Sequence, residues 1–166
     1  MVKPLQKSVG QCGKHHRLKV CVAFSSGGHY VEAMQLKEAL GDFDICYVAP
    51  YAVTTKDLEN VHFLVDTTGH RILGPMILNT VISLFILLKE HVDVIITTGA
   101  EILIPLCYLS KLLFGAKIIF IETFARITSP SFTGRVVYPI ADVFLVQWKS
   151  LLKYYGKKAK YIGRVF

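Results

Sequence analysis

Short, unbroken apolar runs alternate with stretches of helical periodicity from residue 18 onward. Runs of this kind are typical of strands that are buried on both faces of a parallel sheet. The alternation of strands and helices predicts an α/β, Rossmann-like fold with a doubly wound parallel sheet. The expected strands are 18–24, 44–50, 61–65, 92–98, 116–122 and 142–147, with a last short strand within 160–166. The expected helices are 30–40, 72–88, a segment that ends near 114, a short one within 123–141, and 148–156.

The sequence predicts one domain preceded by a polar arm. Residues 1–17 are polar and basic and are expected to form a flexible basic arm, whereas 18–166 is expected to be a single domain. The first 17 residues show no apolar core of a secretory signal, which indicates a cytoplasmic protein. The four cysteines have no C-x-x-C spacing, and Cys21, Cys46 and Cys107 lie in apolar runs, so these three are expected to be buried free thiols. Cys12 with His15 and His16 is a weak match to a metal site.

The chain is both apolar and basic. Hydrophobic residues make up 52% of its 166 residues, and 19 Lys and Arg against 12 Asp and Glu give a net charge of +7. This combination favours three kinds of partner, namely nucleic acid, an anionic membrane surface or a phosphate-bearing substrate. The sequence has no RNA-binding aromatic motif, zinc finger or basic zipper, so no nucleic-acid partner is expected.

The helix expected at 72–88 has too many apolar residues for a helix that covers one sheet. Twelve of its 17 residues are Ile, Leu, Val, Met or Phe, yet it is shorter than a membrane span of about 20 residues. A covering helix needs only one apolar stripe, so its outer face is expected to meet a partner subunit or the membrane interface. The alternative is a helix buried entirely within the domain. Arg71, Lys111 and Lys117 are candidates for attracting lipid phosphates.

Ligands of doubly wound sheets bind at the loops that follow the strands. The first of these loops, Ser25-Ser26-Gly27-Gly28-His29, would let Ser26, Gly27 and Gly28 approach a phosphate closely. It lacks the third glycine of G-x-G-x-x-G and the lysine of a Walker A loop. A tight turn capped by serine is the alternative interpretation. His29 is a candidate general base, or only a polar cap.

Two later loops carry further polar candidates. Thr98, Gly99 and Glu101 follow the fourth strand, where Glu101 would contact a ligand or only favour the start of a helix. Glu122 ends the fifth strand and Arg126 follows it. Arg126 would hold a phosphate, or the two would form a structural ion pair.

Several of these segments together resemble one family. They are SSGGHxxEAxxL at 25–36, TTGAE at 97–101, IETFARITSPSFTG at 121–134, YPIADVFLVQW at 138–148 and the closing GRVF. The chain resembles the PssD-type subunit of bacterial exopolysaccharide glycosyltransferases. It is similar to the membrane-recruiting subunit of the split UDP-GlcNAc transferase of the dolichol pathway and, more distantly, to the N-terminal lobe of MurG.

The resemblance implies the single N-terminal lobe of a split GT-B glycosyltransferase. A PssE-type partner would supply the C-terminal lobe with most of the UDP-sugar site, and this chain would bind a polyprenyl-diphosphate-linked acceptor. Transfer would be inverting, without metal or other cofactor, at the cytoplasmic face of the plasma membrane, where the polar arm implies peripheral attachment. The resemblance gives His29 and Glu122 catalytic roles and assigns substrate binding to Ser26, Gly27, Gly28, Glu32, Thr98, Gly99, Glu101 and Arg126.

Three alternatives stay open. In the first alternative, Glu122 has no catalytic role and only supports the loop that carries Arg126. The whole chain would be a non-catalytic membrane scaffold that recruits and activates the catalytic chain. A free-standing nucleotide-binding enzyme, such as a small reductase, is disfavoured by the missing glycine of the first loop.

Overall fold

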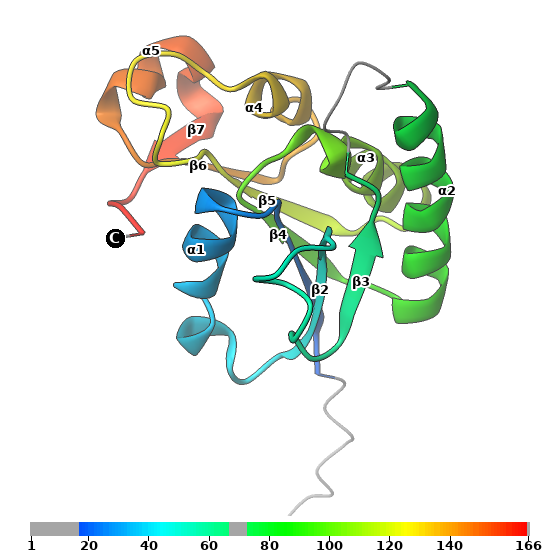
Figure 1. Cartoon of the computed structure of the whole chain (residues 1–166). Coiled ribbons are helices and arrows are strands. Elements are labelled where there is room, and N and C mark those ends of the chain that lie inside the picture. The colour runs from blue at the N-terminus through cyan, green and yellow to red at the C-terminus, as the bar shows by residue number, and fades with distance from the viewer. Residues whose placement is uncertain (1–16, 67–72, 166) are drawn as a thin grey trace, which may run out of the picture.

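The fold is a seven-stranded, all-parallel sheet with helices on both faces, which confirms the predicted Rossmann-like architecture (Figure 1). The computed structural model describes residues 17–66 and 73–165. The strand order is β3-β2-β1-β4-β5-β6-β7, and every neighbouring pair is parallel. The strands are β1 (Lys19–Ala23), β2 (Asp44–Pro50), β3 (Val61–Leu64), β4 (Val94–Thr97), β5 (Lys117–Ile121), β6 (Val143–Val146) and β7 (Ala159–Tyr161).

The helices lie where the periodicity predicts them, with two differences. The expected helix 148–156 is instead a four-residue α-helix, α5 (Leu152–Tyr155), between the 3-10 helices η3 (Lys149–Leu151) and η4 (Gly156–Lys158). The expected helix 30–40 is instead α1 (Gly28–Met34) followed by a turn and the 3-10 helix η1 (Glu38–Leu40). Backbone bonds to the third residue back, from Leu36 to Ala33 and from Lys37 to Met34, tighten the chain after α1. The other helices are α2 (Leu73–Glu90), η2 (Glu101–Leu103), α3 (Ile104–Leu113) and α4 (Phe132–Val137).

The core consists of two apolar layers, one on each face of the sheet. Helices α2, α3, α4 and α5 contribute to the larger layer, which includes Cys21, Cys46 and Cys107 as buried free thiols, as predicted. The smaller layer lies between the sheet and α1. Burial of unbroken apolar strands between two helical layers explains why the strand sequences show no alternation.

The side of α2 that packs on the domain combines two polar residues with the apolar Ile86 and Leu87. Asn79 and Ser83 are buried against the domain, and the Asn79 side chain bonds both the backbone N–H and the C=O of Val65, each at 2.8 Å. Exposed apolar side chains lie along the rest of the helix surface. We call them the α2 apolar face; they are Leu73, Ile77, Leu78, Val81, Phe85 and Leu88.

The prediction of an uncovered apolar face on this helix is confirmed. Ile77 and Phe85 are each 67% exposed, so the alternative of a fully buried helix is wrong. The expectation that this helix is shorter than a membrane span is corrected. Within residues 17–66 and 73–165, α2 is the helix that is long and apolar enough, with 18 residues, to cross a membrane, and only 22% of this stretch is buried. Such a face must be covered by a lipid surface or a protein.

Two of the three basic residues expected to attract lipid phosphates, Lys111 and Lys117, have an acidic partner within the fold. Lys111 Nζ and Lys117 Nζ lie 2.7 Å and 3.4 Å from the carboxylate of Asp142, so both are engaged within the fold. Arg71, the loop at 67–70 and, apart from Arg17, the basic arm lie outside the described residues. The attraction of lipid phosphates to Lys111 is therefore weakened by its internal partner.

Candidate functional site

The carboxyl ends of β1 and β4 enclose the point at which the strand order reverses. The chain runs from β1 to β2 on one side and from β4 to β5 on the other, and the loops that follow β1 and β4 separate there. In doubly wound folds, ligands bind in the crevice at this switch point. A cavity of about 180 Å³ lies there, and we call it the switch-point cavity. Its lining residues are His29, Thr98, Gly99, Ala100, Glu101, Thr123, Arg126, Ser131, Phe132 and Thr133.

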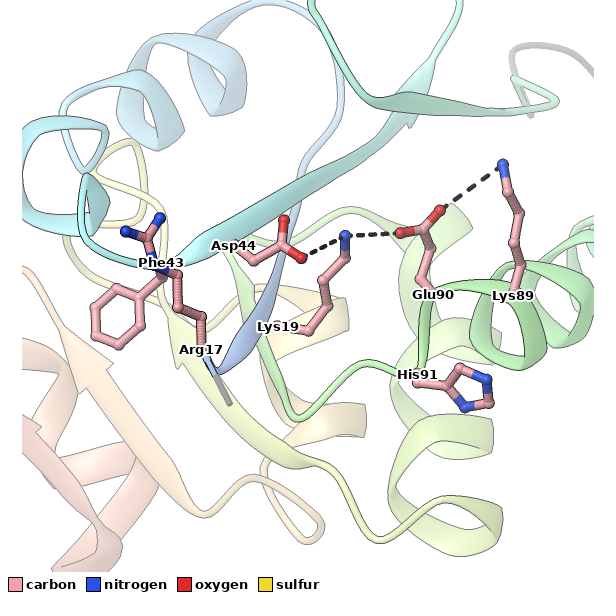
Figure 2. Close-up of a pocket in the computed structure, with 7 residues that line it drawn as sticks. All are labelled: Arg17, Lys19, Phe43, Asp44, Lys89, Glu90 and His91. Atoms are coloured by element: carbon pink, nitrogen blue, oxygen red, sulfur yellow. Dashed lines mark hydrogen bonds and ion pairs between the residues drawn. The ribbon is translucent and has the colours of Figure 1, made fainter. Parts of the chain in front are cut away.

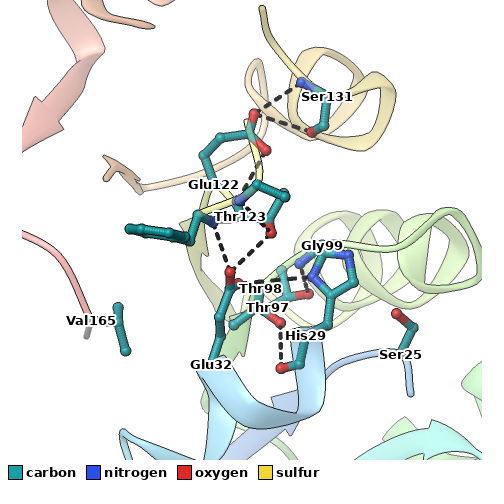
Figure 3. Close-up of polar contacts among 12 residues, drawn as sticks. Ser25, His29, Glu32, Thr97, Thr98, Gly99, Glu122, Thr123, Ser131 and Val165 are labelled. Carbon is teal, nitrogen blue, oxygen red and sulfur yellow. Dashed lines mark hydrogen bonds and ion pairs between the residues drawn. The ribbon is translucent and has the colours of Figure 1, made fainter. Parts of the chain in front are cut away.

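Three loops that are distant in sequence form this cavity. His29 comes from the start of α1, Thr98, Gly99 and Glu101 follow β4, and Arg126 follows β5. These five residues were all predicted to contact substrate or to act in catalysis, and the structure brings them together. Figure 3 shows three of them, His29, Thr98 and Gly99. Their convergence on one concave site is the arrangement expected of a binding site in this fold.

His29 is held at the mouth of the cavity by its backbone. Its carbonyl oxygen accepts a 3.2 Å hydrogen bond from Thr98 Oγ1, which ties the start of α1 to the loop after β4. The ring lies beside Gly99, where an added Cβ would be 3.6 Å from His29 Cε1. Gly99 has a φ of 100°, a conformation that favours glycine. The next residue, Ala100, has a φ of 141°, and strained backbone of this kind is concentrated at functional sites.

Glu32 is buried behind the cavity rather than lining it. It is 3% exposed, and its Oε1 accepts hydrogen bonds from Thr123 Oγ1 at 2.9 Å and from the Phe124 N–H at 2.7 Å (Figure 3). Its Oε2 lies 3.9 Å from His29 Nδ1. The carboxylate therefore connects α1 to the loop after β5, a position that does not favour the predicted direct contact with substrate.

Glu122 is fully buried and does not line the cavity. Its carboxylate accepts hydrogen bonds from the Thr123 N–H at 3.1 Å, from the Ser131 N–H and Oγ at 3.2 and 3.1 Å, and from the Tyr155 hydroxyl. Burial and this carboxylate raise the pKa of Tyr155, so the phenol stays a donor. Four donors to one carboxylate anchor the loop that carries Arg126, which is the alternative role considered for Glu122. Its catalytic role stays a prediction that this geometry does not favour.

Arg126 is exposed and lies in a turn of the loop that follows β5. Its backbone N–H donates to the Thr123 carbonyl at 3.0 Å, and its side chain lines the cavity. Over the described part of the chain, Arg126 forms no ion pair with Glu122 or any other carboxylate. An unpaired guanidinium beside a polar cavity is suited to bind phosphate oxygens.

Ser26, Gly27 and Gly28 lie next to His29 but do not line the cavity. All three are exposed, and Gly27 has a φ of 79°. A Cβ at either glycine would meet nothing within 4 Å. Their contact with a phosphate stays a prediction, and it would require a ligand that extends beyond the cavity.

The structure adds lining residues that the sequence analysis did not single out. Thr123, Ser131, Phe132 and Thr133 belong to the loop after β5 and to the start of α4. Ser131 caps α4 by accepting a 2.8 Å hydrogen bond from the Gly134 N–H. The segment 121–134 is one of those that carry the family resemblance. Its sequence alone does not distinguish the residues that line the cavity from those that support the loop.

A larger cavity, of about 580 Å³, lies at the opposite end of the sheet (Figure 2). Its central charges are paired with one another, because Lys19 Nζ lies 3.1 Å from Asp44 and 2.9 Å from Glu90. Burial would raise the pKa of Glu90, but hydrogen bonds from Lys19 and His62 outweigh it and lower this pKa. This cluster joins β1, β2 and α2 and is structural. In the part of the chain that the structure describes, no cluster of three or more His, Cys, Asp or Glu is placed to hold a metal ion.

The comparisons with solved structures concern the fold. The chain superposes on MurG from Acinetobacter baumannii with a TM-score of 0.71 at 12% identity, covering 89% of this chain and 45% of that one. The UDP-N-acetylglucosamine 2-epimerase of Rickettsia bellii gives a TM-score of 0.72 at 12% identity, covering 90% and 46%. At such identities the similarity shows a fold shared with one lobe of these proteins.

The comparisons with sequences identify a family. The UDP-N-acetylglucosamine transferase subunit alg14 of Schizosaccharomyces pombe is 43% identical over 77 residues, which are 44% of this chain and 36% of that relative. The subunit ALG14 of Yarrowia lipolytica is 28% identical over 178 aligned positions, covering 90% and 82%. The model of the family described as "Oligosaccharide biosynthesis protein Alg14 like" matches residues 72–165, more than half of the chain. The chain therefore belongs to the Alg14-like family of oligosaccharide biosynthesis proteins.

Proposed function

We propose that this chain is the membrane-associated, acceptor-binding subunit of a two-chain glycosyltransferase. The enzyme moves a sugar from a UDP-sugar to a polyprenyl-diphosphate-linked acceptor in polysaccharide biosynthesis. The observation that carries the proposal is the convergence of His29, Thr98, Gly99, Glu101 and Arg126 on the switch-point cavity. The relatives' names support it, since each is called a subunit of a UDP-N-acetylglucosamine transferase, which favours that donor here as well.

The cavity residues suit an inverting, single-displacement transfer. His29 takes the proton of the acceptor hydroxyl as its oxygen attacks the anomeric carbon of the donor sugar. The bond from that carbon to the diphosphate of UDP breaks, and UDP leaves with the electron pair. Arg126 contacts the diphosphate of the acceptor, and the exposed Gly27 and Gly28 lie next to His29 in the chain.

We propose that the α2 apolar face attaches the protein to the membrane. A polyprenyl acceptor is held in a bilayer, so the subunit that binds it must approach the lipid surface. Ile77, Val81 and Phe85 lie one helical turn apart and are exposed. An amphipathic helix of this kind lies in the plane of the interface with its apolar side in the lipid. We place this surface on the cytoplasmic face of the plasma membrane.

The proposed enzyme needs a second chain. We infer a PssE-type chain that supplies a C-terminal lobe with most of the UDP-sugar site, and we place this chain in the PssD-type branch on the strength of its combined motifs. The superposition on less than half of MurG supports the existence of a second lobe in the complete enzyme.

The test is sugar transfer in the complex of this chain with its partner. His29→Ala is expected to lower kcat by about 100-fold or more, because general base catalysis contributes 10²–10⁴-fold. Arg126→Ala is expected to raise KM for the acceptor about tenfold, since a charge-assisted bond to phosphate is lost.

Matched controls are available away from the cavity. His91→Asn and Arg135→Ala alter an exposed histidine and an exposed arginine that do not line the cavity, and both are expected to retain activity. If His29→Ala and Arg126→Ala retain full transfer while the chain is still required, the subunit is a non-catalytic scaffold and the catalytic part of the proposal is wrong.

A further inference from the structure

Two buried polar atoms without a hydrogen-bond partner face each other beside the switch-point cavity. They are His29 Nδ1 and Glu32 Oε2, which are 3.9 Å apart and are both shielded from solvent. An unpaired buried polar atom is costly, so two such atoms one turn apart on the same helix require an explanation. Figure 3 shows the Glu32 carboxylate and the His29 ring directed toward one another above α1.

The carboxylate cannot easily turn away from the ring. Its other oxygen is fixed by Thr123 Oγ1 at 2.9 Å and by the Phe124 N–H at 2.7 Å. These two donors come from the loop after β5, so they hold the group from the side opposite α1. With Oε1 occupied, Oε2 is left as an acceptor that only a nearby donor can satisfy. Nδ1 of His29 becomes that donor when it carries the ring proton.

The His29 ring has its other edge in a different environment. Its side chain is 26% exposed, and the residue lines the cavity. Since Nδ1 is buried, the exposed part of the ring is the part that reaches the cavity. The 3.9 Å separation of Nδ1 and Oε2 is longer than a hydrogen bond, so the pairing requires a movement of the ring toward the carboxylate.

We propose that Glu32 is a positioning residue that acts through His29: it accepts the Nδ1 proton and leaves Nε2 as the basic atom that faces the cavity. The role rests on the proposed function, in which His29 is the base. In this arrangement the acceptor hydroxyl meets the base His29, and the carboxylate of Glu32 orients that base, as in catalytic triads. The carboxylate selects one tautomer and then stabilises the positive ring that forms when Nε2 accepts the acceptor's proton.

The substitution Glu32→Gln separates this role from the structural role of Glu32. The amide oxygen of glutamine can still accept the bonds from Thr123 and Phe124. Its NH₂ group would then face Nδ1 and donate to it, which favours the opposite tautomer, with the proton on Nε2. Glu32→Gln is therefore expected to retain the fold, whereas the proton on Nε2 prevents His29 from acting as the base.

The first readout is the tautomer of His29 in the full chain, measured from the ¹⁵N chemical shifts of the ring nitrogens. The wild type is expected to carry its proton mainly on Nδ1, and Glu32→Gln mainly on Nε2. Glu38→Gln, which alters an exposed carboxylate on η1, is the matched control and should leave the tautomer unchanged. Thr123→Val removes one donor to Glu32 and keeps the carboxylate, so it should retain the wild-type tautomer. A wild-type ring with its proton mainly on Nε2 would overturn the inference.

The second readout is sugar transfer by the complex with the partner. Glu32→Gln is expected to lower kcat by about 100-fold with little change in KM, because it removes the function of the base but not a substrate contact. In a His29→Ala background, Glu32→Gln should change kcat by less than about twofold, since residues that act as one unit are not additive. A further loss in that background of the same size as in the wild type would show that Glu32 does not act through His29.

The two readouts distinguish failure of this inference from failure of the proposed function. The tautomer is measured without substrate, so the expected tautomers together with transfer that is insensitive to His29→Ala would reject the base and keep the pairing. Activity that depends on His29 but is unchanged by Glu32→Gln would reject the positioning role alone.

Discussion

Replacing two residues of the α2 apolar face by serine, as Ile77→Ser with Phe85→Ser, is expected to release the protein from lipid surfaces. Each side chain is 67% exposed, so about two thirds of its area is available to a bilayer. Full burial of such a side chain contributes about 1.5–3 kcal/mol, so two thirds of it gives about 1–2 kcal/mol per residue. The double variant should therefore lose about 2–4 kcal/mol of binding, which is at least about 30-fold in the partition coefficient.

The measurement is co-sedimentation with vesicles that contain phosphatidylglycerol, over a range of lipid concentrations. Thermal unfolding of the free protein should be nearly unchanged, because surface substitutions usually alter stability by less than about 0.5 kcal/mol. Ile162→Ser is the matched control, since Ile162 is 73% exposed and belongs to the C-terminal segment far from α2 (Figure 1). Equal partitioning of the double variant and the wild type would refute the assignment of this face to the membrane.

The remaining predictions concern stability and are measured by urea unfolding. Burial would raise the pKa of Asp142, but hydrogen bonds from Lys111 and a backbone N–H lower it to about 2. A lowered folded-state pKa stabilises the fold above the unfolded value of 3.8, and this contribution is lost as pH falls toward 2. Asp142→Asn should thus cost on the order of 1–2 kcal/mol at pH 7, allowing for partial exposure, and flatten the decline of stability between these pH values. A variant as stable as the wild type at pH 7 would contradict this. Gly134→Ala places a methyl group 2.5 Å from a buried carboxylate oxygen and should cost about 1–3 kcal/mol, whereas Gly74→Ala, which meets nothing within 4 Å, should not. Asn79→Ala leaves a backbone N–H and C=O without partners and should cost about 2 kcal/mol or more; a smaller loss would mean that water replaces the side chain.

The sheet could be predicted from the sequence because its strands are buried on both faces. Runs such as 44–50 contain almost nothing but apolar residues, and β2 begins and ends at these same residues. The order of the strands in the sheet needed the structure, although right-handed crossovers limited the choices. The helix at 30–40 was predicted too long, because the pattern of apolar residues is similar in an α-helix and in the tighter turns that follow Met34.

The candidate site was only partly predictable. Loops at the carboxyl ends of parallel strands identified His29, Thr98, Gly99, Glu101 and Arg126, and the structure brings all five to one cavity. The sequence could not separate them from the carboxylates that support them. A glutamate on a helix and a glutamate at the end of a strand look alike in sequence whether they face a ligand or the interior.

Local sequence determined the elements of this protein, since the periodicity of apolar residues acts over a few residues at a time. It also determined that one helix has more apolar surface than the domain can cover. Only the tertiary structure decided which side of that helix faces out, because Asn79 turns inward to satisfy the backbone of Val65. Only the tertiary structure placed Glu32 against His29 and surrounded Glu122 with four donors, since those partners come from segments as distant as residue 155. Burial and hydrogen bonding between distant segments depend on how the chain packs, and these two properties decide what a carboxylate does.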